Sequence, residues 1–182
     1  MTGELEVLTT VTGRLEAAGI AYMVTGSFAA NYYAVPRMTR DIDLVVELSA
    51  GDADRFCDLF EGDFYLDRDA VRAAVTGRGA FNLIHQAYVV KVDCIVRKDT
   101  DYRRTEFARQ RRASIEGHGL AIVAPEDLIV SKLDWMRETC SEVQLADVRN
   151  LLRSVPHLDT QYLVLWTERL GVGALYREAL GD

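Results

Sequence analysis

Apolar residues recur at two different spacings along the chain, and the two spacings predict different elements. Intervals of three to four residues are typical of amphipathic helices, whereas alternation and short β-branched runs are typical of strands. Helices are predicted over residues 4–18, 28–34, 52–60, 69–75 and 103–112. Strands are predicted over residues 20–25, 41–48, 80–86 and 87–96, and a short hairpin is predicted around 117–119. Residues 126–180 are predicted to be predominantly helical.

The order of these elements predicts the fold class. Strands dominate the first part of the chain and helices the second, which is typical of an α+β fold. We expect a single domain over residues 1–182, with a mixed β-sheet core flanked by helices over about 1–124 and a helical C-terminal segment over about 125–182. Within the second helix, Ser27 is expected to be the N-cap, and Pro36 is expected to end the helix near Val35.

Composition narrows the class of protein. The chain has 182 residues, of which 49% are hydrophobic and 27% charged, as in an ordinary globular protein. No apolar run approaches the ~20 residues that span a bilayer, and the first residues do not resemble a signal peptide. We therefore expect a cytoplasmic protein that does not enter the membrane. The three cysteines, Cys57, Cys94 and Cys140, are far apart in the sequence and are expected to be reduced thiols.

A net charge of −7 argues against a surface that binds nucleic acid throughout. One short run, residues 103–112, is strongly basic. Its arginines are Arg103, Arg104, Arg109, Arg111 and Arg112. A solvated helix face is one interpretation of this run, and contact with RNA phosphates is the other.

Two carboxylates occur at the start of one predicted strand. Asp41 and Asp43 should project to the same face, with attachment points ~6.6 Å apart. Asp93 lies among apolar residues of another predicted strand, where an unpaired charge is costly. A divalent cation such as Mg²⁺ would resolve the repulsion among the three acids. In the alternative interpretation, Asp41 is solvated while Asp43 and Asp93 pair with buried arginines.

The first predicted strand leads into Gly26 and Ser27 and then into a helix. Free backbone N–H groups at a helix N-terminus bind anions such as a triphosphate. Glycine allows close approach of the backbone, and the Ser27 hydroxyl could donate to a phosphate oxygen. A simple N-cap is the alternative role of Ser27.

These motifs together resemble the DNA polymerase beta-type nucleotidyltransferase superfamily, and most closely its small bacterial AbiEii-like members. The resemblance runs from about Tyr22 to Leu152. The positions that carry it are Gly26, Ser27, Arg37, Thr39, Asp41, Asp43 and Asp93, followed by a C-terminal block with Lys132 and Asp147.

The resemblance implies transfer of a nucleoside monophosphate from an NTP to an acceptor hydroxyl by a two-metal in-line mechanism. Asp41, Asp43 and Asp93 would then be the catalytic residues and would hold two Mg²⁺ ions, with Asp93 able to take the acceptor proton. The nucleotide would be bound by Gly26, Ser27, Arg40 and Lys132. The acceptor stays open: an RNA end, a protein hydroxyl or a small molecule.

Several further interpretations stay open at this point. Lys132 falls on an apolar helix face, where it could bind the triphosphate or pair with Asp147. The protein could be the toxin of a toxin–antitoxin pair, with an antitoxin or a second copy as partner. A nucleotide-binding or structural partner protein without activity is the alternative function. His85, His118 and His157 are expected to be structural or surface groups, and Trp135, Trp166 and Tyr162 to belong to the core.

Overall fold

The sheet of the computed structural model places its strands in the order β3-β4-β5-β2-β1-β7-β6. The structure describes residues 3–139 and 141–181. The strands are β1 (Tyr22–Thr25), β2 (Ile42–Val46), β3 (Phe64–Tyr65), β4 (Ala80–His85), β5 (Val90–Val96), β6 (Arg111–Ile115) and β7 (His118–Ile122). Parallel pairing joins β2 to β5 and β1 to β7, while the other neighbours are antiparallel. The sheet is therefore mixed, as the sequence predicts.

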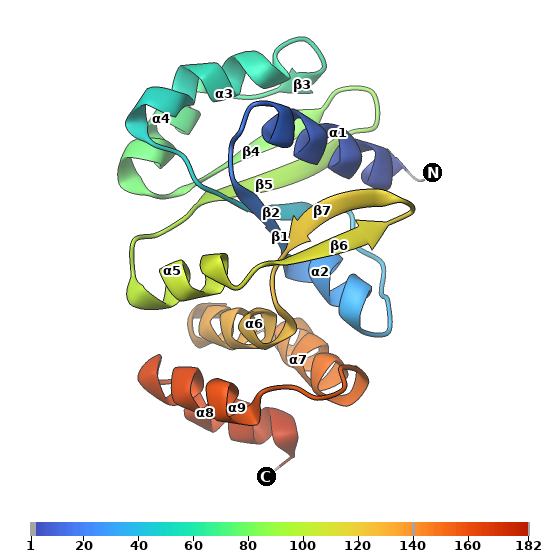
Figure 1. Cartoon of the computed structure of the whole chain (residues 1–182), viewed down its shortest axis with the longest axis vertical. Helices are drawn as coiled ribbons and strands as arrows, with labels where there is room; N and C mark the ends of the chain where they lie inside the picture. The colour runs from blue at the N-terminus through green and yellow to red at the C-terminus, as the bar shows by residue number, and fades with distance from the viewer. Residues whose placement is uncertain (1–2, 140, 182) are drawn as a thin grey trace.

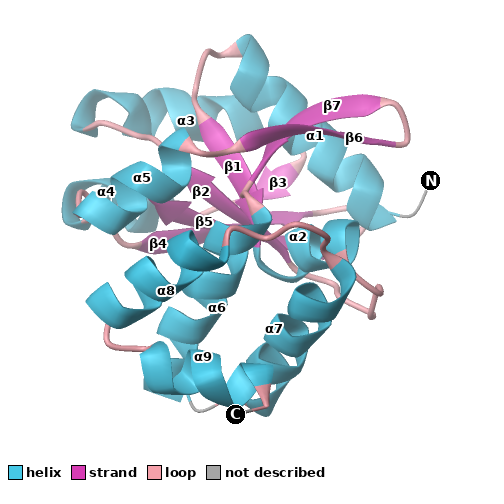
Figure 2. Cartoon of the chain, turned by 60° about the horizontal axis from the view of Figure 1, so that its bottom comes forward, coloured by secondary structure: helices cyan, strands magenta, loops and turns pink. Residues whose placement is uncertain are grey.

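Helices cover the two faces of this sheet unequally. The helices are α1 (Gly3–Ala17), α2 (Gly26–Tyr33), α3 (Ala53–Phe60), α4 (Arg68–Gly77), α5 (Asp101–Ala108), α6 (Pro125–Thr139), α7 (Glu142–Ser154), α8 (Thr160–Arg169) and α9 (Gly173–Leu180). Figure 1 shows α1, α3 and α4 on one side of the sheet and α6–α9 on the other. Seen from the C-terminal side, α2 and α6–α9 form the layer beneath the strands (Figure 2). The described helices include none that is long and apolar enough to cross a bilayer.

Alternation along the central strands separates an apolar face from a polar one. In β2, Ile42 and Leu44 are fully buried, whereas Asp43 between them is partly exposed. The same period runs along β5, where the side chains of Val90, Val92, Cys94 and Val96 are buried, as predicted. Since successive strand residues point to opposite faces, the apolar side chains form the core and the acids face away from it.

Most predicted elements are present, with two corrections at their ends and one additional strand. Helix α2 begins at Gly26 rather than after Ser27, and its N-cap is Thr25, so the predicted capping role of Ser27 is wrong. The predicted basic helix ends at Ala108, and its last residues instead begin strand β6. A two-residue strand, β3, was not predicted, because two residues are too few to show a period.

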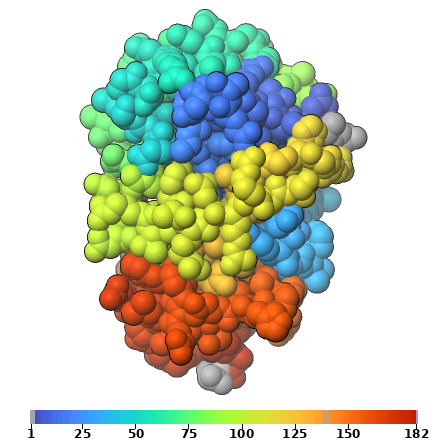
Figure 3. Space-filling view, viewed as in Figure 1, coloured from blue at the N-terminus to red at the C-terminus, as the bar shows by residue number. Residues whose placement is uncertain are grey.

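The predicted hairpin around 117–119 is confirmed as the turn between β6 and β7. Glu116 and Gly117 both adopt positive φ, 49° and 87°. Left-handed geometry at both central residues is the type I′ turn that matches the twist of paired strands. In the space-filling view, α5 and this hairpin form a band between the N-terminal helices and the C-terminal helical segment (Figure 3).

Burial of the aromatic residues agrees with the sequence only in part. Trp166 is buried, as predicted, and Tyr162 is partly buried. Trp135 is 53% exposed, so its predicted core position is wrong. It falls beside the apolar stripe of α6 that Leu133 and Met136 occupy, and one helical step of 100° is enough to turn a side chain out of the core. Cys57 and Cys94 are buried free thiols, while Cys140 lies outside the described residues.

Candidate active site

Asp43 and Asp93 are paired directly across two parallel strands. The register of β2 and β5 aligns Ile42 with Val92 and Asp43 with Asp93. Aligned residues on neighbouring strands project from the same face, so the two carboxylates lie side by side. Asp41 precedes β2 by one residue and is more exposed, with 54% of its side chain accessible compared with 30% for Asp93.

The turn from β1 into α2 lies against Asp43. Thr25, the last residue of β1, is the register partner of Asp43, and Gly26 follows with φ +63°. A Cβ on Gly26 would overlap the Asp43 carboxylate. The backbone N–H of Ser27 donates to the same carboxylate. Glycine is therefore required here twice, for its left-handed backbone and for the close approach of the acid.

The environment of Asp43 opposes its ionisation. Burial is the main cause and the adjacent Asp93 charge the next, and together they raise the pKa of Asp43 to about 6. The Ser27 N–H and the ammonium of Lys132 act in the opposite direction. An acid with a raised pKa beside a second acid is the pattern that a bound cation would relieve.

Lys91 forms ion pairs with Asp93 and Asp41. Its Nζ lies 2.8 Å from Oδ2 of Asp93 and 3.7 Å from Oδ2 of Asp41. Lys91 precedes Asp93 by two residues on β5, so strand alternation turns both to the same face. Lys91 was not among the predicted site residues, although the alternation in VKVD (90–93) places it on the same face as Asp93.

A second group of charges connects the Gly-Ser turn to the helical segment. Arg37 donates through Nη2 to Oγ of Ser27 at 2.6 Å and through Nε to Asp147 of α7 at 2.7 Å. Lys132 of α6, only 4% exposed, donates through Nζ to the same Asp147 at 2.8 Å and to Gln144 at 2.9 Å. Lys132 thus pairs with Asp147, one of the two roles left open by the sequence, and hydrogen bonds of both cations hold the pKa of Asp147 below its usual value despite burial.

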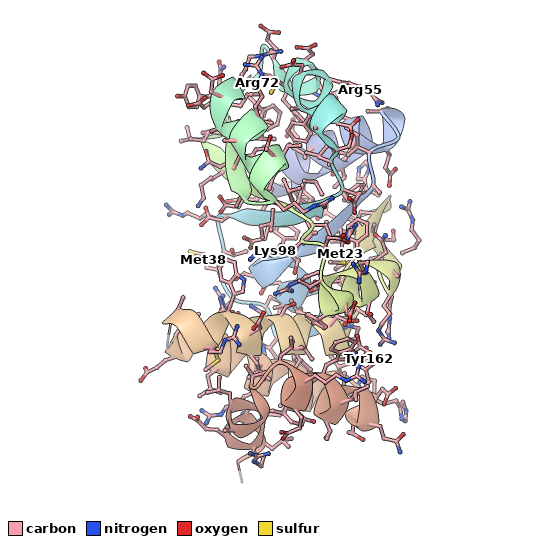
Figure 4. The ribbon with its side chains drawn as sticks, turned by 90° about the vertical axis from the view of Figure 1, so that its left-hand side faces the viewer. Met23, Met38, Arg55, Arg72, Lys98 and Tyr162 are labelled. Carbon is pink, nitrogen blue, oxygen red and sulfur yellow. The ribbon has the colours of Figure 1, made fainter. Side chains whose placement is uncertain are left out.

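Arg40 stands apart from this group. It is exposed in the segment between α2 and β2, immediately before Asp41. Neighbouring Met38 is 85% exposed and points outward from the same segment (Figure 4). No ion pair among the described residues involves Arg40, so its predicted role in nucleotide binding stays a prediction.

The donor set fits a hard divalent cation. All three acids offer carboxylate oxygens, which Mg²⁺ prefers as ligands. The ion pairs of Lys91 with Asp93 and Asp41 show that a positive charge is favourable at this position. The acids are not drawn together as a closed site: across residues 3–139 and 141–181, no three carboxylate, imidazole or thiol groups are gathered tightly enough to hold a metal by themselves.

The basic run is neutralised by acids of the same chain. Each of its five arginines has at least one carboxylate partner. The pairs are Arg103 with Glu106 and Asp134, Arg104 with Asp99 and Asp101, Arg109 with Asp127 and Glu126, Arg111 with Glu126, and Arg112 with Glu16. Such pairing leaves little net positive charge for RNA phosphates.

Comparison with solved structures identifies the fold of the chain. No protein-family profile and no curated protein matches the sequence. The solution structure of the antibiotic-resistance factor ANT(2″)-Ia aligns over 97% of this chain and 96% of its own, with a TM-score of 0.60 and 14% identity. Its crystal structure in complex with adenylyl-2″-tobramycin aligns over 93% and 98%, with a TM-score of 0.57 and 15% identity.

A third solved structure, the lincosamide antibiotic adenylyltransferase LnuA with lincomycin bound, aligns over 82% of this chain and 96% of its own, with a TM-score of 0.54 and 12% identity. The chain has the nucleotidyltransferase fold. The predicted α+β class is therefore confirmed. The AbiEii-like subtype stays a prediction.

Proposed function

We propose that this chain is a magnesium-dependent nucleotidyltransferase that transfers a nucleoside monophosphate from an NTP to an acceptor hydroxyl and releases pyrophosphate. The observation that supports it most is the alignment of Asp43 with Asp93 directly beside the Gly26–Ser27 turn. This arrangement brings a set of oxygen ligands next to a helix N-terminus on one face of the sheet. The nucleotidyltransferase fold of the chain is consistent with the proposal.

The start of α2 is suited to bind the triphosphate. Its N-cap, Thr25, makes no side-chain hydrogen bond to the first turn, so the backbone N–H groups there, apart from that of Ser27, which donates to Asp43, are available to an anion. The Ser27 hydroxyl is oriented by Arg37, whose guanidinium lies within reach of the same anion. Arg40, exposed and adjacent to Asp41 in the sequence, would add a further positive charge for the triphosphate.

Asp41, Asp43 and Asp93 would hold two Mg²⁺ ions, which when bound neutralise the phosphates and activate the acceptor oxygen. The side chain of Asp93 is 30% exposed, and we assign to it the role of accepting the proton of the acceptor hydroxyl. Asp43, whose carboxylate lies against Gly26, would bind a metal ion next to the triphosphate. The Lys132 ammonium lies close enough to Asp43 to favour its ionised form. The ion pair with Asp147 fixes the position of Lys132.

We place a small hydroxylated molecule first among the acceptors. Two proteins of the same fold are described as binding such molecules, lincomycin in LnuA and adenylyl-2″-tobramycin in ANT(2″)-Ia. The internal pairing of all five arginines of the basic run weakens the case for an RNA end. The role as the toxin of a toxin–antitoxin pair stays a prediction that no observation of this structure favours.

The proposal is tested by incubating the protein with α-labelled NTPs, Mg²⁺ and separate pools of aminoglycosides, lincosamides, total RNA and cellular protein. Pyrophosphate release with a labelled acceptor is expected, and it should be lost in Asp43→Asn and Asp93→Asn. Asp69→Asn is the matched control, because Asp69 is an exposed acid on α4, across the sheet from the site. NTP binding without pyrophosphate release or labelled product in any pool would favour the non-catalytic alternative.

A further inference from the structure

The Lys91 ammonium lies where a cation shared by two of the candidate metal ligands would lie. It contacts Oδ2 of Asp93 at 2.8 Å and approaches Oδ2 of Asp41 to 3.7 Å. Asp93 and Lys91 lie on β5, and Asp41 lies just before β2, so the Lys91 ammonium bridges two neighbouring strands. Asp43 takes part in neither ion pair. The Lys91 ammonium therefore bridges only Asp93 and Asp41.

Metal binding and this bridge compete for the same oxygen atoms. A Mg²⁺ ion binds a carboxylate oxygen at about 2.0–2.1 Å. An ammonium that stayed 2.8 Å from the same oxygen would then be a close neighbour of a divalent cation, and the two positive charges would repel. Both cations therefore cannot keep their full contacts with Asp93.

Lys91 has a route away from the acids. Its side chain is 41% exposed, and its four-carbon stem can swing the ammonium into solvent without moving the strand. Asp41 is 54% exposed and immediately precedes β2, so it lies outside the β2–β5 ladder. Asp43 and Asp93 are held in register by the β2–β5 ladder.

We infer that Lys91 is the built-in counter-ion of the metal-free site, and that a divalent cation must displace its ammonium from Asp93 and Asp41 before these acids can act as ligands. This inference rests on the proposed function, because it assumes that the three acids bind metal. Lys91 would then be a positioning residue that keeps the acids together without metal and sets the metal concentration at which the site fills.

The inference is tested by measuring Mn²⁺ affinity with calorimetry and with the electron paramagnetic resonance signal of free Mn²⁺, in the presence of a non-hydrolysable NTP analogue. Lys91→Met removes the competing charge and should bind Mn²⁺ about 2- to 5-fold more tightly than the wild-type protein, the range that a partly exposed ion pair spans. Lys91→Arg keeps the charge and should stay near the wild-type affinity.

A second measurement separates the counter-ion role from simple repulsion of metal. In EDTA, Lys91→Met should melt at a lower temperature than the wild-type protein, and added Mg²⁺ should raise its melting temperature by more. Lys98→Met is the matched control, since Lys98 is an exposed lysine that follows the opposite end of β5, and it should change neither quantity.

The outcomes distinguish this inference from the proposed function. If the wild-type protein binds Mn²⁺ and Lys91→Met binds it equally or more weakly, the counter-ion role is wrong while the nucleotidyltransferase proposal stands. If neither protein binds Mn²⁺ with the analogue present, both are wrong. Tighter binding by Lys91→Met, with wild-type affinity in Lys91→Arg, supports both.

Discussion

The carboxylate of Asp43 lies directly against the Cα of Gly26, so closely that no side chain fits between the acid and the backbone. The contact joins the end of β1 to the start of β2, two strands that pair antiparallel. It also brings the Ser27 N–H onto Asp43, because Ser27 follows in the same turn. The position of this partly buried acid therefore depends on the absence of a side chain at Gly26.

Gly26→Ala should destabilise the protein and displace Asp43. The added Cβ meets the carboxylate, and an alanine at φ +63° is strained by about 1–2 kcal/mol. Gly19→Ala is the matched control, since Gly19 has φ +66° but nothing within 4 Å of the added Cβ. Urea unfolding should show a larger loss for Gly26→Ala than for Gly19→Ala. Equal losses would mean that the contact with Asp43 contributes nothing beyond backbone strain.

Asp43→Asn should stabilise the metal-free protein at neutral pH. The pKa of Asp43 is raised to about 6 by burial and by Asp93, above the ~3.9 of an unfolded aspartate. The folded state therefore binds this proton more tightly, and wild-type stability gains from protonation as pH falls from about 6 to about 4. The variant should melt higher than the wild-type protein at pH 7.5 in EDTA, and the gap should narrow by pH 5. A variant that melts lower at pH 7.5 would contradict this electrostatic explanation.

Asp147→Asn should cost more stability than Lys132→Met. Asp147 accepts hydrogen bonds from two cations, Arg37 and Lys132, and Lys132 is only 4% exposed. Removing the acid leaves the buried ammonium hydrogen-bonded to Gln144 but without a carboxylate partner, a change that costs about 3–5 kcal/mol. Lys132→Met instead leaves Asp147 paired with Arg37. Chemical denaturation of both variants measures the difference.

The same pair of variants resolves the role of Lys132. Because its Nζ is held by Asp147 and Gln144, we expect Lys132→Met to retain most of the wild-type affinity for NTP. A large rise in the nucleotide Kd without loss of stability would instead assign Lys132 to the triphosphate.

Arg109→Ala should destabilise the protein by about 2–4 kcal/mol, whereas Arg104→Ala should leave its stability close to that of the wild-type protein. Arg109 donates through Nε to Asp127 at 2.8 Å, and Asp127 is fully buried. Arg104 instead pairs with two exposed acids, Asp99 and Asp101.

Thermal unfolding of the two arginine variants, together with a filter-binding assay for RNA, separates structural from RNA-binding roles. Tyr162, which donates to Asp127, lies in the helical segment at the opposite end of the molecule from Arg55 and Arg72 (Figure 4). Unequal stability with unchanged RNA binding is expected. Equal stability with weakened RNA binding in both variants would restore the basic run as a phosphate-binding surface.

The sequence by itself determined which residues could share a face. A strand period of two places Asp41 with Asp43 and Lys91 with Asp93, whatever the strands pair with. Local signals also predicted the α+β class, the β6–β7 hairpin and the helical C-terminal segment, because these depend on periodicity and turn residues within a few positions.

Only the tertiary structure decided which strands become neighbours. The pairing of β2 with β5, and the register that aligns Asp43 with Asp93, join residues 50 positions apart that no local preference can bring together. For the same reason, the partners of the five arginines, the exposure of Trp135 and the bridge from Lys91 to Asp41 could not be derived beforehand. Local spacing sets the direction of a side chain along its own element, but what it meets there is set by packing between distant elements.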